Sequence, residues 1–89
     1  MASGKDAMIN RLRRIEGQVR GLQKMIEEDR SCEDVLIQIN AVTSAMHKVK
    51  EIILKEYAER CVLEYETTGD RSKLDSLISL LSKHMGGRR

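Results

Sequence analysis

The chain has 89 residues, lacks Pro, Phe and Trp, and carries a net charge of only +2 from 16 basic and 14 acidic side chains. This length limits it to one domain, and two cysteines are too few for a disulfide scaffold. No apolar run approaches the roughly 18–20 residues that span a bilayer, and residues 1–20 contain no secretory signal. Because helix-forming residues dominate the rest, we expect a cytoplasmic, all-α protein that contacts no membrane.

The first helix is predicted over residues 5–28. Its apolar residues recur at alternating spacings of four and three: Met8, Leu12, Ile15, Val19, Leu22 and Ile26. This period of 3.5 residues is typical of helices that pack at a shallow angle in a bundle or coiled coil. Gly17 and Gly21 interrupt the helix at a cost of about 1 kcal/mol each, which close packing or the close approach of a partner would explain.

The second helix is predicted over residues 32–65, after the break EDRSCED. Ser31 is a good N-cap residue, and Asp34 stands at the third helical position. The same apolar spacing continues in Val35, Ile39, Val42, Met46, Val49 and Ile53, and neither Pro nor Gly interrupts it. Since aromatic side chains make up only 2% of the residues, we expect helices of further copies to complete the core.

A third, short helix is predicted over residues 71–84, after a turn at Gly69. Its apolar residues are expected on one face, namely Leu74, Leu77, Ile78 and Leu81. Two glycines, Gly86 and Gly87, should end the helix. We therefore expect a single helical domain over residues 1–85 and a disordered tail over residues 86–89.

The two cysteines, Cys32 and Cys61, both fall on the second helix, 29 positions apart. A continuous helix would separate them by about 43 Å along its axis, whereas a disulfide needs Cα atoms within roughly 7 Å. In an antiparallel dimer, Cys32 of one chain would instead meet Cys61 of the other, twice by symmetry. Cys32 lies at a helix N-terminus, where the helix dipole favours an anion, so we expect it to be the nucleophile. The spacing alone leaves open that both are small core residues.

Charge is segregated along the chain. Residues 1–26 hold six basic and two acidic side chains, a balance of +4, whereas residues 27–34 hold five acidic and one basic, a balance of −4. Such segregation indicates a basic face with a function, although the residues alone favour an ordinary solvated face. The candidates for contacts with DNA are Arg11, Arg13, Arg14, Arg20, Lys24 and Lys48. His47 is expected to be a polar residue of the helix or part of this face rather than a ligand.

Two stretches, RRIEGQVRGL and CEDVLIQINA, resemble the signature of the copper-sensitive operon repressor (CsoR/RcnR/FrmR) family of bacterial transcriptional repressors. The resemblance covers about residues 5–83. It implies three helices per chain and an antiparallel dimer with a four-helix bundle core, paired into a dimer of dimers. It also implies that the protein represses transcription by binding double-stranded operator DNA, and that essential basic residues of the family match Arg11 and Lys48.

The same resemblance implies where an inducer would be sensed. In the family's copper sensors, a cysteine of one protomer and a His-x-x-x-Cys pair of the other hold the metal. The two cysteines match Cys32 and Cys61, but the histidine position falls on Tyr57. A neutral phenol is a poor ligand for Cu(I), which prefers thiolate, thioether or imidazole. Nickel and cobalt sensors of the family use a histidine near the N-terminus, and residues 1–12 contain none.

The chain therefore looks closest to the persulfide-sensing, CstR-like branch, in which added sulfur bridges thiols of opposing protomers. On this interpretation the inducer is a persulfide or polysulfide and no cofactor is needed. One alternative is a repressor that senses Cu(I) through the same two thiolates, and another is a homo-oligomeric helical scaffold that binds no DNA. No catalytic constellation is present, so we do not expect an enzyme.

Overall fold

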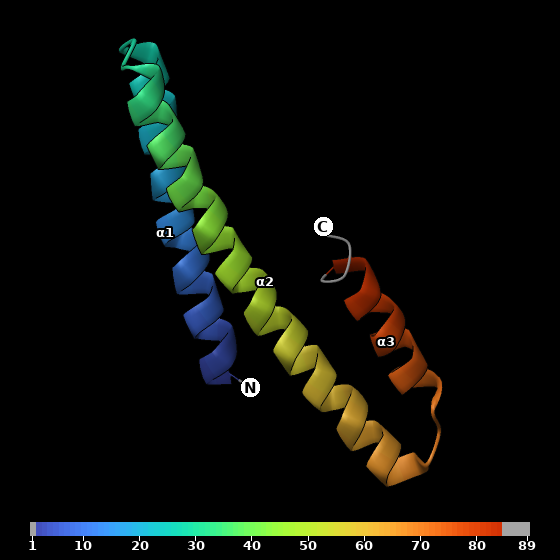
Figure 1. The fold of residues 1–89 in the computed structure, drawn as a ribbon. Coiled ribbons are helices and arrows are strands. Elements are labelled where there is room, and N and C mark those ends of the chain that lie inside the picture. The colour runs from blue at the N-terminus through green and yellow to red at the C-terminus, as the bar shows by residue number, and fades with distance from the viewer. Residues whose placement is uncertain (1, 85–89) are drawn as a thin grey trace. The chain divides into compact units, whose positions relative to one another are not determined.

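The computed structural model describes residues 2–84, with side chains from Gly4 onward, as three α-helices (Figure 1). They are α1 (Ala2–Glu27), α2 (Cys32–Thr68) and α3 (Ser72–His84). The described residues contain no strand, which confirms the predicted all-α class. Every helix end lies within three residues of its predicted position, and the predicted tail at residues 86–89 lies outside the described part of the chain.

The chain divides into two compact units, one that ends at Glu51 and one that begins at Ile52. The first unit holds α1 and the N-terminal part of α2, and the second holds the rest of α2 with α3. The single domain expected over residues 1–85 stays a prediction. Over residues 2–84, no helix combines the length and the apolar character that crossing a membrane requires.

The turn between α1 and α2 is closed by backbone hydrogen bonds. The N–H of Asp29 donates to the carbonyl of Ile26 at 3.1 Å, and the N–H of Arg30 donates to the carbonyl of Met25 at 2.9 Å. Asp29 has a positive φ of 57°. This is the Schellman arrangement that ends many helices, here with aspartate in place of glycine at the left-handed position.

In the first unit, α1 and the N-terminal part of α2 lie side by side (Figure 1). Ile15 and Val49 are buried, and the Gln38 amide donates to the Gln18 carbonyl at 3.0 Å. A Cβ at Gly21 would lie 3.6 Å from the Gln38 amide nitrogen, an ordinary van der Waals contact. Packing within the chain therefore does not account for this glycine.

The apolar stripe of α2 is only partly covered by its own chain. Val35, Val42 and Val49 are partly or fully buried, whereas the alternating stripe residues Ile39 and Met46 are exposed. Two neighbours, Leu36 and Ile37, are also exposed, at 53% and 60%. One set of heptad positions in α2 thus has no partner among the described residues.

The second unit is a hairpin of the C-terminal part of α2 and α3. The hydroxyls of Thr67 and Thr68 each donate a hydrogen bond of 2.9 Å to a backbone carbonyl one turn earlier in α2. Gly69 then turns the chain with a φ of 77°, which glycine adopts without strain. The Asp70 carboxylate accepts the backbone N–H of Ser72 at 2.9 Å where α3 begins.

The face of α3 that packs on α2 differs from the predicted one at a single position. Leu77 is buried, and Leu74, Leu80 and Leu81 are partly buried. Ile78, predicted on the same face, is 57% exposed. Successive helical residues are separated by about 100°, so Ile78 is rotated away from the side that Leu77 presents, and Leu80 takes its place.

Candidate functional site

Cys32 is the first residue of α2, and its side chain is exposed. The Ser31 hydroxyl accepts the backbone N–H of Asp34 at 3.1 Å, which confirms the predicted N-cap. The Arg30 guanidinium lies 3.1 Å from the Asp34 carboxylate and offsets part of the acidic charge beside the thiol. The cap therefore fixes Cys32 at the helix start, where a reagent reaches it without any rearrangement of the first unit.

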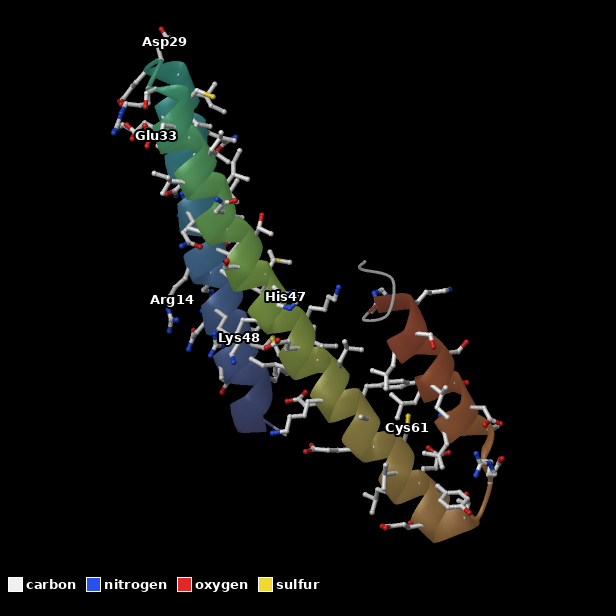
Figure 2. The ribbon with its side chains drawn as sticks, in the orientation of Figure 1. Arg14, Asp29, Glu33, His47, Lys48 and Cys61 are labelled. Carbon is white, nitrogen blue, oxygen red and sulfur yellow. The ribbon has the colours of Figure 1, made fainter. Side chains whose placement is uncertain are left out.

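Cys61 lies in the opposite kind of environment. Its side chain points toward α3 and is only 2% exposed (Figure 2). Leu54, Tyr57, Cys61 and Glu64 follow one another at spacings of three, four and three, so they share one face of α2. The last of them, Glu64, lies with its carboxylate 3.6 Å from the Lys73 ammonium of α3. α3 therefore covers the face of α2 that carries this thiol.

Tyr57 is partly buried one helical turn before Cys61. The side-chain interaction of its phenol with Cys61 raises the pKa of Tyr57 above its usual value. Burial and the negative charge of an ionised Cys61 raise the pKa further, while the nearby cations Lys73 and Arg60 act in the opposite direction. A raised pKa keeps the phenol neutral at pH 7.

The two thiols belong to different units, Cys32 to the first and Cys61 to the second, and both lie on α2. α2 is continuous from Cys32 to Thr68, as the predicted separation of the cysteines requires. Over residues 2–84, no three side chains among His, Cys, Asp and Glu gather where they could hold a metal ion.

The basic residues predicted to contact DNA lie on α1 and on the first part of α2. Arg11 is partly buried and lines a small hollow with Arg14, Ile15, Gln18 and Ala45. Arg13, Arg20 and Lys24 are exposed on α1. No described acidic side chain forms an ion pair with any of these five cations of α1. Their positive charge is therefore not neutralised within the described chain.

Lys48 and His47, both labelled in Figure 2, share one acidic neighbour on α2. The Lys48 ammonium lies 3.9 Å from one carboxylate oxygen of Glu51, and the His47 Nε2 lies 3.5 Å from the other. All three side chains are exposed, so these contacts are weak in water.

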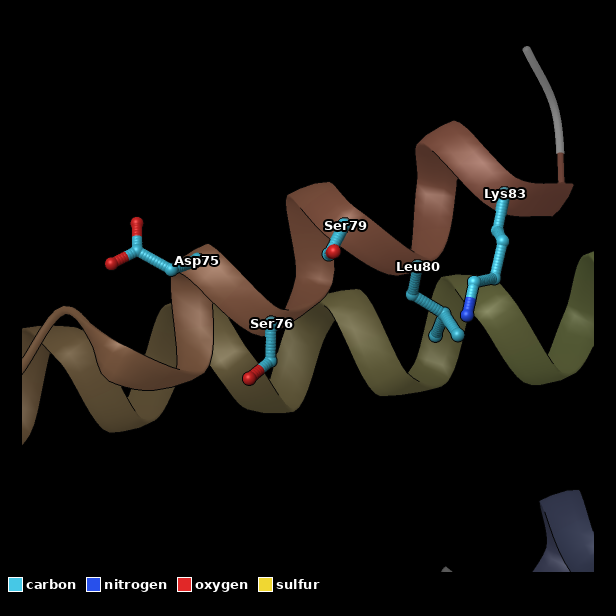
Figure 3. A pocket seen from close by; sticks show the side chains of 5 residues that line it. All are labelled: Asp75, Ser76, Ser79, Leu80 and Lys83. Carbon is cyan, nitrogen blue, oxygen red and sulfur yellow. The ribbon is translucent and has the colours of Figure 1, made fainter. Parts of the chain in front are cut away.

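A shallow hollow lies on α3. It is lined by Asp75, Ser76, Ser79, Leu80 and Lys83 (Figure 3). The lining combines one acid and one base with two hydroxyls and a leucine, and includes neither Cys61 nor Tyr57. We assign it no role in sensing.

Three residues of the α2–α3 hairpin were not among the predicted site residues. They are the buried Leu77 and the pair Lys73 and Glu64, which joins α3 to α2. The sequence signal for Leu77 was its place in the apolar pattern of the third helix. That pattern does not say which residue of α2 lies opposite it, so the sequence did not reveal the cover over the thiol.

The chain matches a family model described as "Metal-sensitive transcriptional repressor" over residues 4–83. The copper-sensing transcriptional repressor CsoR of Bacillus subtilis is 45% identical over 80 residues, which are 89% of this chain and 79% of that protein. The copper-sensing transcriptional repressor RicR of Mycobacterium tuberculosis is 57% identical over 58 residues, which are 65% of this chain and 60% of RicR.

Two solved structures share the fold. One is the copper-sensing repressor CsoR with Cu(I) from Geobacillus thermodenitrificans NG80-2, with a TM-score of 0.83 and 36% identity over 93% of this chain and 88% of that chain. The other is the nickel-responsive transcriptional regulator InrS, with a TM-score of 0.81 and 35% identity over 88% of this chain and 89% of that chain.

These relatives correct one expectation. The prediction that the sensor needs no cofactor, with Cu(I) only as an alternative, is wrong, because the matched CsoR and RicR are named as copper sensors and one CsoR was solved with Cu(I). The relatives do not support the persulfide-sensing branch, and the family consists of transcriptional repressors, which are not enzymes. Because the family model covers residues 4–83 and the Bacillus subtilis CsoR is 45% identical, the chain belongs to the family of metal-sensitive transcriptional repressors.

Proposed function

We propose that the chain represses transcription by binding operator DNA and releases the DNA when Cu(I) binds to Cys32 and Cys61 of opposing protomers. The observation that carries this proposal is the placement of two thiols on one continuous helix, in a chain whose matched relatives are named copper-sensing. Thiolates are the protein ligands that Cu(I) prefers. The donor set of this chain therefore suits Cu(I).

A second copy of the chain would bring the two thiols together. Cys32 begins α2 and Cys61 lies seven residues before its last residue, Thr68. In an antiparallel pair of α2 helices, the beginning of one lies beside the end of the other. The exposed apolar residues Ile39, Met46 and Ile53, spaced by seven, would supply the packing surface for such a pair. We propose a dimer of this kind and a dimer of dimers as the assembly.

Within this assembly, Cys32 of one protomer and Cys61 of its partner would hold the ion. Cu(I) would thereby link the two chains. Tyr57 adds no strong ligand, because a neutral phenol is a poor ligand for Cu(I) and the neighbouring Cys61 raises the pKa of Tyr57 above its usual value. Nickel is a weaker candidate, because Ni²⁺ favours imidazole and the chain has only two histidines, with none in residues 1–12.

The proposed DNA surface consists of Arg11, Arg13, Arg14, Arg20, Lys24 and Lys48. Contacts of arginine and lysine go largely to phosphates, so affinity should fall steeply as salt rises. The inducer can weaken DNA binding only to the extent that it favours a different arrangement of the chains. A bond between Cys32 of one protomer and Cys61 of the partner subunit would act on that arrangement.

The test uses the reduced protein without oxygen, bound to a fluorescent DNA fragment from upstream of its own gene. Buffered Cu(I) is added, and release is followed by anisotropy. We expect release near one Cu(I) per chain in the parent protein and none in Cys32→Ser or Cys61→Ser. Retention of the DNA at saturating Cu(I) by the parent protein would refute the proposal, and failure to bind DNA at all would favour the helical scaffold.

A second candidate function, persulfide sensing, is favoured by one observation, the tyrosine at the position where the family's copper sensors have histidine. The same DNA complex is therefore treated with a polysulfide in parallel. Masses of the chains are then recorded under denaturing, non-reducing conditions. Release by polysulfide alone, with a cross-linked dimer heavier than a plain disulfide by added sulfur, would replace Cu(I) as the inducer.

A further inference from the structure

The register of the α2–α3 hairpin places Leu77 opposite Cys61. The Lys73 ammonium lies 3.6 Å from the Glu64 carboxylate, which sets these two residues at the same level of the antiparallel pair. Leu77 follows Lys73 by four residues, and Cys61 precedes Glu64 by three, so the next level along the hairpin joins Leu77 to Cys61. These two residues are among the most buried in the chain, at 8% and 2% exposed.

We propose that α3 is a lid over Cys61, and that this thiol becomes accessible to Cu(I) or to Cys32 of the partner subunit only when α3 moves away from α2. The role of the uncovered thiol rests on the proposed function, whereas the cover itself is a property of one chain. The burial of Cys61 arises from the chain alone, with no second copy present. Exposed Cys32 has no such cover, so only one of the two sensor thiols is gated.

The contacts that close the lid are few, which is what a moving element requires. α3 has 13 residues, a length at which an isolated helix is marginal in water. Among its residues only Leu77 is buried. The Lys73–Glu64 pair is about half exposed on both sides and therefore contributes little. Gly69, with a φ of 77°, provides the turn about which α3 can move.

The lid is tested by alkylation of Cys61 with iodoacetamide in full-length Cys32→Ser, with Cys61→Ser as the reference for Cys32. Rates are read from intact mass, and each is divided by the rate of the same thiol in denaturant to remove differences in intrinsic reactivity. We expect the normalised alkylation rate of Cys61 to be lower than that of Cys32 by roughly tenfold or more. Equal normalised rates would overturn the proposal.

Matched substitutions on α3 identify the source of the protection. Added to Cys32→Ser, Leu77→Ala should accelerate alkylation of Cys61 roughly tenfold, because it removes the buried contact. Ile78→Ala, which truncates the exposed neighbour, should leave the rate unchanged. If both variants react like Cys32→Ser alone, the protection comes from elsewhere, such as a second chain, and the lid is refuted.

A pair of charge reversals keeps the test decisive if Leu77→Ala does not fold. Glu64→Lys places two cations opposite each other and should accelerate alkylation, and Lys73→Glu added to it should restore the slow rate. A double variant as fast as the single one would refute the ion pair as a closing contact. Because no step uses Cu(I) or DNA, the lid can hold while the proposed function fails, and the reverse outcome is equally distinguishable.

Discussion

The ammonium of Lys73 lies 3.6 Å from the carboxylate of Glu64 and joins α3 to the face of α2 that carries Cys61. An exposed pair of this kind adds little to stability, but it reports the register of the hairpin. In that register the buried Leu77 lies level with the buried Cys61. If α3 is the proposed lid, the reactivity of Cys61 depends on the stability of this 13-residue helix.

Weakening the lid should make the sensor more responsive. A site that is open for only a fraction of the time has its apparent affinity reduced by that fraction. Leu77→Ala should therefore lower the Cu(I) concentration that releases half of the bound DNA, while Ile78→Ala leaves it unchanged. The measurement is a Cu(I) titration of the DNA complex by anisotropy, and a midpoint shared by all three proteins would contradict the prediction.

Removing one cation from the proposed DNA surface should weaken DNA binding. We expect Arg11→Ala to cost about 1–3 kcal/mol if the arginine contacts a base, or to reduce the salt slope by about one if it contacts phosphate. The measurement is anisotropy with operator DNA at several salt concentrations. Arg71→Ala, which removes an exposed arginine paired with Asp75 on the third helix, is the control and should bind like the parent. If the two variants bind alike, Arg11 is not part of the surface.

Loss of the cap beside Cys32 should destabilise the start of α2. Ser31→Ala removes the oxygen that accepts the Asp34 N–H at 3.1 Å, and such changes cost about 1 kcal/mol. We expect a lower midpoint in urea unfolding followed by circular dichroism. Ser44→Ala, at an exposed position within α2, should be neutral or stabilising because alanine is the better helix former. A Ser31→Ala midpoint equal to that of the parent would show that the cap adds nothing.

Stability of the α3 end should depend on pH through Asp70. Its pKa is held below the ordinary 3.8 mainly because the backbone N–H of Ser72 donates to the carboxylate, with smaller help from the Ser72 hydroxyl and the Lys73 charge. A lowered pKa stabilises the fold above pH 3.8, and the benefit is lost as pH falls through the folded value. The parent should therefore unfold at a higher temperature than Asp70→Asn at pH 7.

The two proteins should converge as the pH is lowered below 3.8. The other carboxyl groups titrate in both proteins, so the difference in melting temperature isolates Asp70. A difference that stays constant from pH 7 down to acid would contradict the assigned role of this carboxylate.

The sequence contained enough local information to place the three helices. Three signals depend only on neighbours within one or two turns: the Ser31 cap, the turn at Gly69 and the apolar period of 3.5 residues. The cap, the turn and the helices lie where they were predicted. The error at Ile78 has a different origin. Its spacing from Leu74 fits a helix face, but the centre of that face is decided by contact with α2.

The candidate site was predicted only in part. Both thiols, Tyr57 and the basic residues were named from the sequence, but the weight given to Tyr57 led to a wrong expectation about the cofactor. Two thiolates suit Cu(I) and persulfide chemistry alike, so side-chain types did not decide between them. The matched relatives are named as copper sensors, which favours Cu(I) over persulfide chemistry.

By itself, the sequence determined the all-α class, the helix limits within three residues and the separation of the cysteines along one helix. Only the tertiary structure decided that Cys32 is exposed, that Cys61 is buried and that interaction with Cys61 raises the pKa of Tyr57. The physical reason is the distance along the chain over which each effect acts. Caps and periods act over a few residues, whereas burial of Cys61 depends on which residue of α3 packs against it across the hairpin.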